Sequence, residues 1–249
     1  MIRLILKILL GLIVFVAIWH LITVTFQLPN YLLPPPLDVW HAFVTNADHI
    51  IENSAVTLQE VLIGFVIANV LSVSIAIAVG FFPRLEGGAV ATAVIMKTLP
   101  IIALAPLLVL WFGPGVWSKV AAVVVICFFP SLVNVLRGIK SLDASARDLI
   151  LLYSPTKLQI VRYFILPGVR PYLYSALKVS SSLAVVGALV GEFISANQGL
   201  GFMIISGYYA MDVPLVFAVL VVTSAIGLLM YGLIHALESR HQASLRIDS

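Results

Sequence analysis

Charged residues and cysteine are both scarce in this chain of 249 residues, and each scarcity excludes a class of protein. Only 10% of the residues are Asp, Glu, Lys or Arg, against about 25% in ordinary soluble domains, which argues against a water-soluble globular fold. The one cysteine, Cys127, excludes an internal disulfide framework and a cysteine-based metal cluster. A net charge of +3 gives no indication of a nucleic-acid-binding surface.

Two sequence signals of chemistry are also missing. The phosphate-binding pattern G-x-x-x-x-G-K-[ST] does not occur, so the chain is not predicted to bind ATP or Mg²⁺ itself and any energy must come from another subunit. The five histidines show no paired spacing typical of metal ligands, so no metal site is predicted.

Apolar residues, in contrast, make up 61% of the chain, and the mean hydropathy is +1.12. A membrane-spanning helix needs about 20 residues, so the length permits about six spans in one transmembrane domain over 1–249. We therefore expect an all-α, polytopic membrane protein. Apolar windows predict helices at 4–26, 55–82, 89–111, 117–136, 173–194 and 214–237.

Basic residues orient these spans, because Lys and Arg near span ends stay on the cytoplasmic side. None occurs from 8 to 83 or from 179 to 239, and twelve of the fourteen fall at alternate span ends. This pattern predicts both termini in the cytoplasm. Lys119 lies at an outer boundary, where its stem is expected to snorkel, and Glu60, near another outer end, is expected to contact water.

The two sizeable segments between spans differ in character. Outside, residues 27–54 contain Leu37, Trp40, Val44, Ala47 and Ile51 at helical spacing, which predicts an interfacial helix that contacts membrane lipid. Inside, residues 138–172 predict two short helices with a sharp joint, the first capped by Asp143 and running to about Tyr153.

The second inner helix is predicted to begin with Ser154 as N-cap and Pro155 at its first position. Leu158 shares a face with Val161 and Ile165, and Pro167 is expected to end the helix. Composition alone favours the interpretation of such an amphipathic pair as a surface that rests on lipid headgroups.

Small residues predict close helix packing in the fifth span. Ser180, Ala184 and Ala188 recur every four positions, and Gly187 and Gly191 form a G-x-x-x-G pair.

Four residues are candidates for the lining of a pathway. Pro100 and Pro106 remove backbone donors from the third span and favour a bend, and bent helices often line cavities. Lys97 in the same span either attracts an anionic solute or snorkels to the inner headgroups. Glu192, close to an outer end, either faces the pathway or pairs near the external loop.

Five segments resemble the permease subunits of binding-protein-dependent ABC importers. The first is the inner loop, where Asp148 matches the acidic position of the family's coupling loop, Ser154 stands at its glycine position, and Leu166 and Pro167 match its ending. The others are LLPPPLDVWHAF (32–43), KTLPIIALAPLLVLWFGPGVWSK (97–119), FFPSLVNVLRGIKSLD (128–143) and GEFISANQGLGFMI (191–204), which resemble the branch for sulfonates such as taurine, nitrate-like anions and thiamine pyrimidine precursors.

This resemblance implies a type I permease fold in the cytoplasmic (inner) membrane of a bacterial-type cell. It also implies the partners: a second permease copy, two cytoplasmic ATPase subunits that bind ATP and Mg²⁺, and a soluble or lipid-anchored solute-binding protein, with no nucleic acid. The inner loop would dock on the ATPase. An autonomous secondary transporter or channel and an intramembrane enzyme are the alternatives, but inverted repeats, several buried charges or a convergent catalytic set are not evident.

Overall fold

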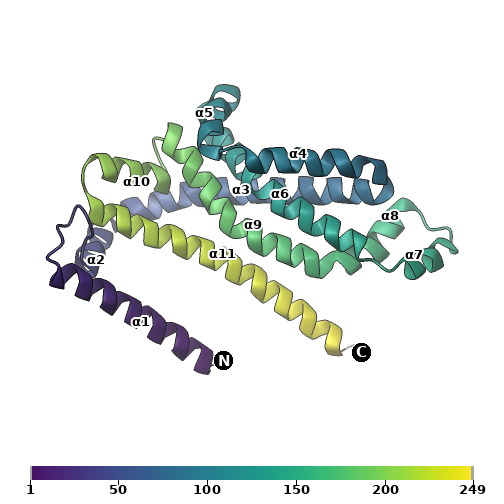
Figure 1. Ribbon diagram of the computed structural model, residues 1–249, viewed down its shortest axis with the longest axis horizontal. Helices are drawn as coiled ribbons and strands as arrows, with labels where there is room; N and C mark the ends of the chain where they lie inside the picture. Colours follow the sequence, from purple (N-terminus) through teal and green to yellow (C-terminus); the bar gives the residue numbers. More distant parts are fainter. Residues whose placement is uncertain (1, 248–249) are drawn as a thin grey trace.

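The computed structural model describes the backbone of residues 2–247 and the side chains of 10–143, 145–146, 149–150 and 152–242. The described backbone consists of helices and their connections, without strands, so the all-helical prediction is confirmed (Figure 1). The helices are α1 (Ile2–Thr25), α2 (Pro36–Thr45), α3 (Ala47–Phe81), α4 (Glu86–Thr98), α5 (Ile101–Phe112), α6 (Val116–Lys140), α7 (Ala144–Leu151), α8 (Lys157–Ile160), α9 (Leu166–Ser195), α10 (Leu200–Tyr209) and α11 (Val213–Ile247).

Four helical stretches of the described part are long and apolar enough to cross a membrane: α3, α6, α11, and the run Lys157–Ser195 that contains α9. The pair α4 and α5 makes a fifth candidate if counted as one broken span. The described part of α1, Leu10–Thr25, is a shorter apolar helix where the first span is predicted.

The third predicted span is bent, as its prolines favour. Helices α4 and α5 meet at 103°, and the break falls at Leu99 and Pro100, both with extended backbone. A proline disfavours the helical conformation in the residue before it, which explains the extended ψ of 124° at Leu99. Pro106 lies inside α5 without ending it.

The external segment differs from the prediction of one helix running through Ile51. Helix α2 ends at Thr45, and α3 begins at Ala47, eight residues earlier than expected for the second span. Asn46 separates the two with a non-helical φ of −106°, and its side chain donates a hydrogen bond to the Ala42 carbonyl. The amide of Asn46 thus binds a backbone carbonyl near the end of α2, which is typical of asparagine where a helix ends.

Helices α3, α6 and α9 form the centre of the molecule. Helix α6 packs against both of the others, and one buried cluster joins Val61 of α3, Cys127 of α6 and Ala184 of α9. A Cβ on Gly64 would come within 2.5 Å of the Val123 side chain, so glycine is required for the approach of α3 to α6.

The long helices run roughly along one axis (Figure 1). The start of α1 and the end of α11 point the same way, toward the end where α7 and α8 lie, while α2 and α10 lie at the other end. We refer to these as the coupling end and the external end, after the roles predicted from the sequence for residues 138–172 and 27–54.

Candidate functional site

The segment between α6 and α9 begins with the predicted cap. Asp143 precedes α7, and its Oδ1 accepts a hydrogen bond from the Ser145 backbone N–H at 2.9 Å. Helix α7 ends at Leu151, two residues before the expected Tyr153. The backbone of Asp148 lies within α7, but its side chain is outside the described residues.

Ser154 forms the joint, though not as the predicted N-cap. It has a φ of 48°, the left-handed region that glycine adopts readily and a residue with a Cβ adopts at a cost of roughly 1–2 kcal/mol. The prediction that Ser154 is the N-cap of the second helix is therefore wrong. Ser154 thus adopts a conformation that glycine favours, at the position predicted to match a glycine of the coupling loop that this segment resembles.

Thr156 instead caps the second helix. Its Oγ1 accepts from the Gln159 N–H, and the Gln159 side chain accepts from the Thr156 N–H, a complete capping box at the start of α8. Pro155 therefore precedes the cap and does not occupy the first helical position.

Pro167 does not end this helix, contrary to the prediction. The chain stays helical from Lys157 to Ser195, a run of 39 residues, with a π-helical turn at Val161–Ile165. Pro167 falls within the first two positions of α9, where a missing donor is tolerated. In a π turn the backbone hydrogen bonds join residues five positions apart in place of four. The helix therefore continues past Pro167 without a break.

The segment from α7 to the π turn, 144–165, exposes large apolar and aromatic side chains. The exposed fractions are 79% for Leu152, 83% for Tyr153, 75% for Leu158 and 68% for Tyr163. The face predicted for the second inner helix consists of Leu158, Val161 and Ile165, and of these only Ile165 is buried. We call the four exposed residues the coupling face.

Behind the coupling face lies a cavity of about 470 Å³. Its walls come from the ends of α3 and α6, the start of α4, and the helices of the inner segment, including Gly80, Ile139 and Phe164. Lys140 pairs with Glu86 at its rim. The segment therefore rests on an incompletely filled space.

Lys97 occupies the last turn of α4, beside the break. It is exposed, and its Nζ lies 4.5 Å from the centre of the Phe129 ring. Eleven residues separate it from Glu86 at the start of the helix, about 16 Å at 1.5 Å per residue. This rise is about half the thickness of a hydrocarbon core of about 30 Å.

At the external end, Glu192 caps α10. Its Oε1 accepts from the Thr57 hydroxyl at 2.6 Å, and its Oε2 accepts from the Gly201 N–H at 2.5 Å. Thr57 Oγ1 also accepts from the Leu200 N–H at 2.8 Å, and Asn53 Oδ1 from the Gly199 N–H at 2.6 Å. We call Asn53, Thr57 and Glu192 with this helix start the cap cluster.

Two further ionisable groups lie buried beside the cap cluster, contrary to the sequence interpretation. Glu60 is 3% exposed, not in contact with water, and its Oε2 has no hydrogen-bond partner among the described residues. Lys119 is also 3% exposed, and its Nζ donates to the carbonyls of Pro114, Gly115 and Ser195 instead of snorkelling.

The small residues of the fifth span lie against α6. A Cβ on Gly187 would come within 2.8 Å of the Val123 Cα, and one on Gly191 within 2.9 Å of the Lys119 Cα. Ser180, Ala184 and Ala188 are buried completely.

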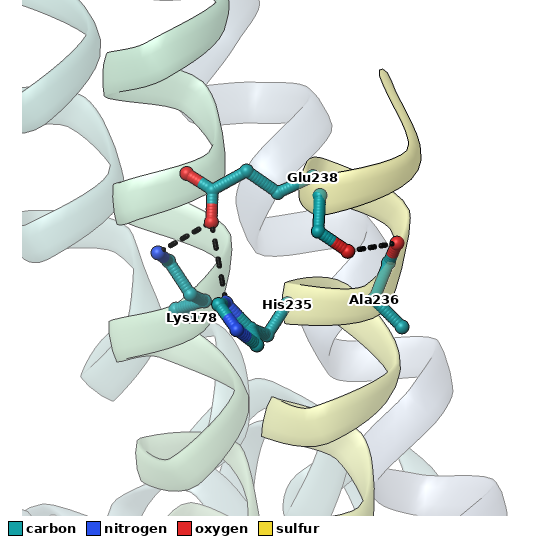
Figure 2. A network of polar contacts seen from close by, with 5 residues as sticks. Lys178, His235, Ala236 and Glu238 are labelled. Carbon is teal, nitrogen blue, oxygen red and sulfur yellow. Dashed lines mark hydrogen bonds and ion pairs between the residues drawn. The ribbon is translucent and has the colours of Figure 1, made fainter. Parts of the chain in front are cut away.

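Toward the coupling end, polar contacts join α9 to α11 (Figure 2). Lys178 donates to Glu238 Oε2 at 2.7 Å, and His235 Nδ1 lies 3.6 Å from the same oxygen. One turn closer to the end of α11, Arg170 contacts His241 at 2.8 Å. Both members of the Lys178–Glu238 pair are mostly buried, so it fixes how α11 lies on α9 more than an exposed pair would.

Sequence reasoning missed Asn53 and Thr57, although a signal existed. With Glu60 they recur at helical spacing on one face, near the start of the second predicted span, which indicates a polar contact inside the protein.

Long apolar helices that small residues hold at close range are typical of a multi-pass membrane protein. The chain belongs to the family described as "Binding-protein-dependent transport system inner membrane component", which it matches over residues 60–242. It is therefore a permease component of an ABC importer and not itself an ATPase.

Three similar relatives illustrate the family. The formylaminopyrimidine transport permease ThiX of Halalkalibacterium halodurans is 34% identical over 84% of each chain. The riboflavin transport permease RibX of Chloroflexus aurantiacus is 30% identical over 87% of this chain and 82% of its own. The taurine permease TauC of Escherichia coli is 25% identical over 91% and 85%.

Proposed function

We propose that two copies of this chain form the pathway of an importer whose two cytoplasmic ATPase subunits bind ATP and Mg²⁺, with a binding protein delivering the solute from outside. Both termini and the coupling end lie in the cytoplasm. The observation that carries the proposal is the coupling face, which projects large apolar side chains from the end of the molecule that holds most basic residues.

The coupling face would dock on the ATPase. Exposed aromatic and aliphatic groups next to charged ones are typical of protein interfaces and are unfavourable when left in water. The residues proposed for this contact, or for the shape of its loop, are Asp148, Tyr153, Ser154, Pro155, Leu158, Leu166 and Pro167.

The break between α4 and α5 is the proposed pathway element, with Lys97, Pro100 and Pro106. Broken helices at membrane depth occur where backbone lines a cavity, and a half-span lysine is tolerated where it faces protein, water or a solute. The helix N-terminus of α5 next to Lys97 favours negative charge.

The solute is proposed to be a pyrimidine precursor of thiamine, in keeping with the name of the relative ThiX. A second candidate is a sulfonate such as taurine or another small anion, which the charge of Lys97 favours and which the relative TauC is named for transporting.

The test begins with the complex in its native membrane. The tagged chain is cross-linked, extracted gently, and its companions are identified. An ATPase subunit and a binding protein are expected. The binding protein is then screened by thermal shift against formylaminopyrimidine, hydroxymethylpyrimidine, taurine, alkanesulfonates, nitrate and bicarbonate, and the ligand that stabilises it names the solute. Recovery without an ATPase would contradict the proposal.

A further inference from the structure

We propose that Glu192 is a positioning residue that holds α10 ready for the solute-loaded binding protein. The inference rests on the proposed function and extends it to a buried side chain that no solute reaches. Glu192 is 1% exposed, so it acts through the elements it joins and not by contact with solute.

Glu192 joins three helices at one point. It belongs to α9, its first carboxylate oxygen binds Thr57 of α3, and its second binds the N–H of Gly201 in α10. A buried carboxyl group without hydrogen-bond partners is costly, so both contacts favour this placement of the start of α10. Since α10 has only ten residues, these bonds are a large part of what fixes its start.

The fit around this carboxylate is also steric. A Cβ on Gly201 would come within 2.8 Å of both Cβ and Oε2 of Glu192, and Gly199 has a φ of 106° that favours glycine. The start of α10 therefore lies against the carboxylate with no space for a side chain, so displacing either group displaces the other.

The far end of α10 is an exposed aromatic surface. Tyr208 is 62% exposed, Tyr209 79% and Met211 70%, and the two rings pack edge to face at 5.5 Å. Tyrosine and methionine are enriched at protein interfaces. The absence of Lys and Arg from 179 to 239 places this surface outside the cell, where the binding protein of this family's transport system would meet it.

The buried face of α10 links the position of its start to the position of the tyrosine surface. Leu200 and Ile204 are buried with Ile50 of α3 and Val219 of α11. If the start of α10 moves, this face repacks and the tyrosine surface moves with it. Loss of the carboxylate should therefore weaken docking of the binding protein.

The experiment uses the whole permease–ATPase complex in liposomes. ATPase rate is measured against the concentration of the native binding protein, loaded with the solute that stabilises it. In Glu192→Gln the amide still accepts from Gly201 N–H, but the Thr57 hydroxyl proton loses its acceptor. We expect the half-saturating concentration to rise roughly tenfold, equal to about 1.4 kcal/mol, with basal and maximal rates within twofold.

Two matched controls isolate the effect. Glu52→Gln removes an exposed carboxylate at the same end of α3 and should leave the curve unchanged. Gly201→Ala should reproduce the shift by displacing the carboxylate, whereas Gly232→Ala, with nothing within 4 Å of the added Cβ, should not. Because Gly201→Ala keeps every ionisable group, it tests the inference even if Glu192→Gln fails to assemble.

An unchanged half-saturating concentration in both variants would overturn the inference, as would a lower maximal rate at unchanged half-saturation, which would place Glu192 in the transport step. Failure of the unmodified chain to bind an ATPase would instead contradict the proposed function itself.

Discussion

At the scale of single residues, the structure stores backbone strain at one position of the coupling segment. Ser154 has a φ of 48° between α7 and the capping box of Thr156, and both neighbouring helices depend on the direction it gives the chain. Serine is not the residue type that this backbone conformation favours. A substitution here can therefore either relieve the strain or increase it.

We predict that Ser154→Gly keeps coupled transport and is neutral or stabilising by up to about 1 kcal/mol, because glycine adopts φ near 50° without a Cβ clash. Ser154→Val should lose most solute-dependent ATPase stimulation, since a β-branched residue resists this conformation. Solute-stimulated ATPase activity in liposomes measures both. Ser145→Val, in the regular helix α7, is the control, and full stimulation in Ser154→Val would contradict the role of the joint.

Lys97 carries the second prediction at this scale. If it attracts an anionic solute, Lys97→Met should raise the half-saturating solute concentration for uptake about tenfold or more, with a smaller effect for Lys97→Arg. A normal apparent affinity in Lys97→Met would remove the lysine from the pathway and favour the neutral pyrimidine solute.

At the scale of elements, the approach of α9 to α6 depends on backbone contact. Gly187 lies against the Val123 Cα, so the neighbour cannot turn away as a flexible side chain would. Sequence periodicity predicts that such small residues pack, but it does not identify the partner helix.

Gly187→Ala should destabilise the protein by about 1–3 kcal/mol through overpacking. Thermal unfolding in detergent measures the loss. Gly227→Ala, whose added Cβ would meet Val185 at an ordinary 3.8 Å, is a matched control and should change little. Equal stability of the two variants would show that α6 and α9 separate without cost.

The bend between α4 and α5 gives the next prediction. Pro100→Ala restores an N–H donor and removes the restraint on Leu99, so the two helices should straighten toward one span. Spin labels at positions 88 and 110 in a Cys127→Ser background should then move apart, toward the roughly 33 Å of a continuous helix. Pro106→Ala should leave the distance unchanged, and an unaltered distance in Pro100→Ala would assign the bend to tertiary packing.

At the scale of the whole molecule, the arrangement predicts which surfaces reagents reach. In intact cells an impermeant thiol reagent should label Tyr209→Cys, whereas Leu152→Cys should react only after the membrane is opened. The native Cys127 is completely buried and should stay unlabelled. Labelling of Leu152→Cys in intact cells would reverse the proposed orientation.

Much of this arrangement follows from the sequence, because long apolar runs and one-sided basic residues depend on local composition. The all-helical class, the cap at Asp143 and the bend near Pro100 could all be predicted from local sequence. What sequence reasoning missed depends on contacts distant in the chain: Lys119 and Glu60 are buried by helices far from them in sequence. The joint was predicted, but the left-handed conformation of Ser154 was missed because a strong local capping signal competed with the conformation that the surrounding helices impose.

The helical run from Lys157 to Ser195 connects the coupling face directly with the cap cluster. At about 1.5 Å per residue, the 27 residues from Ile165 to Glu192 form a rod of roughly 40 Å. A tilt of about 5° at the π turn, beside the cavity, would swing Glu192 by roughly 3.5 Å. Such a displacement is larger than the range of distances over which its two hydrogen bonds can persist. A small movement at one face of the membrane would therefore break contacts at the other face.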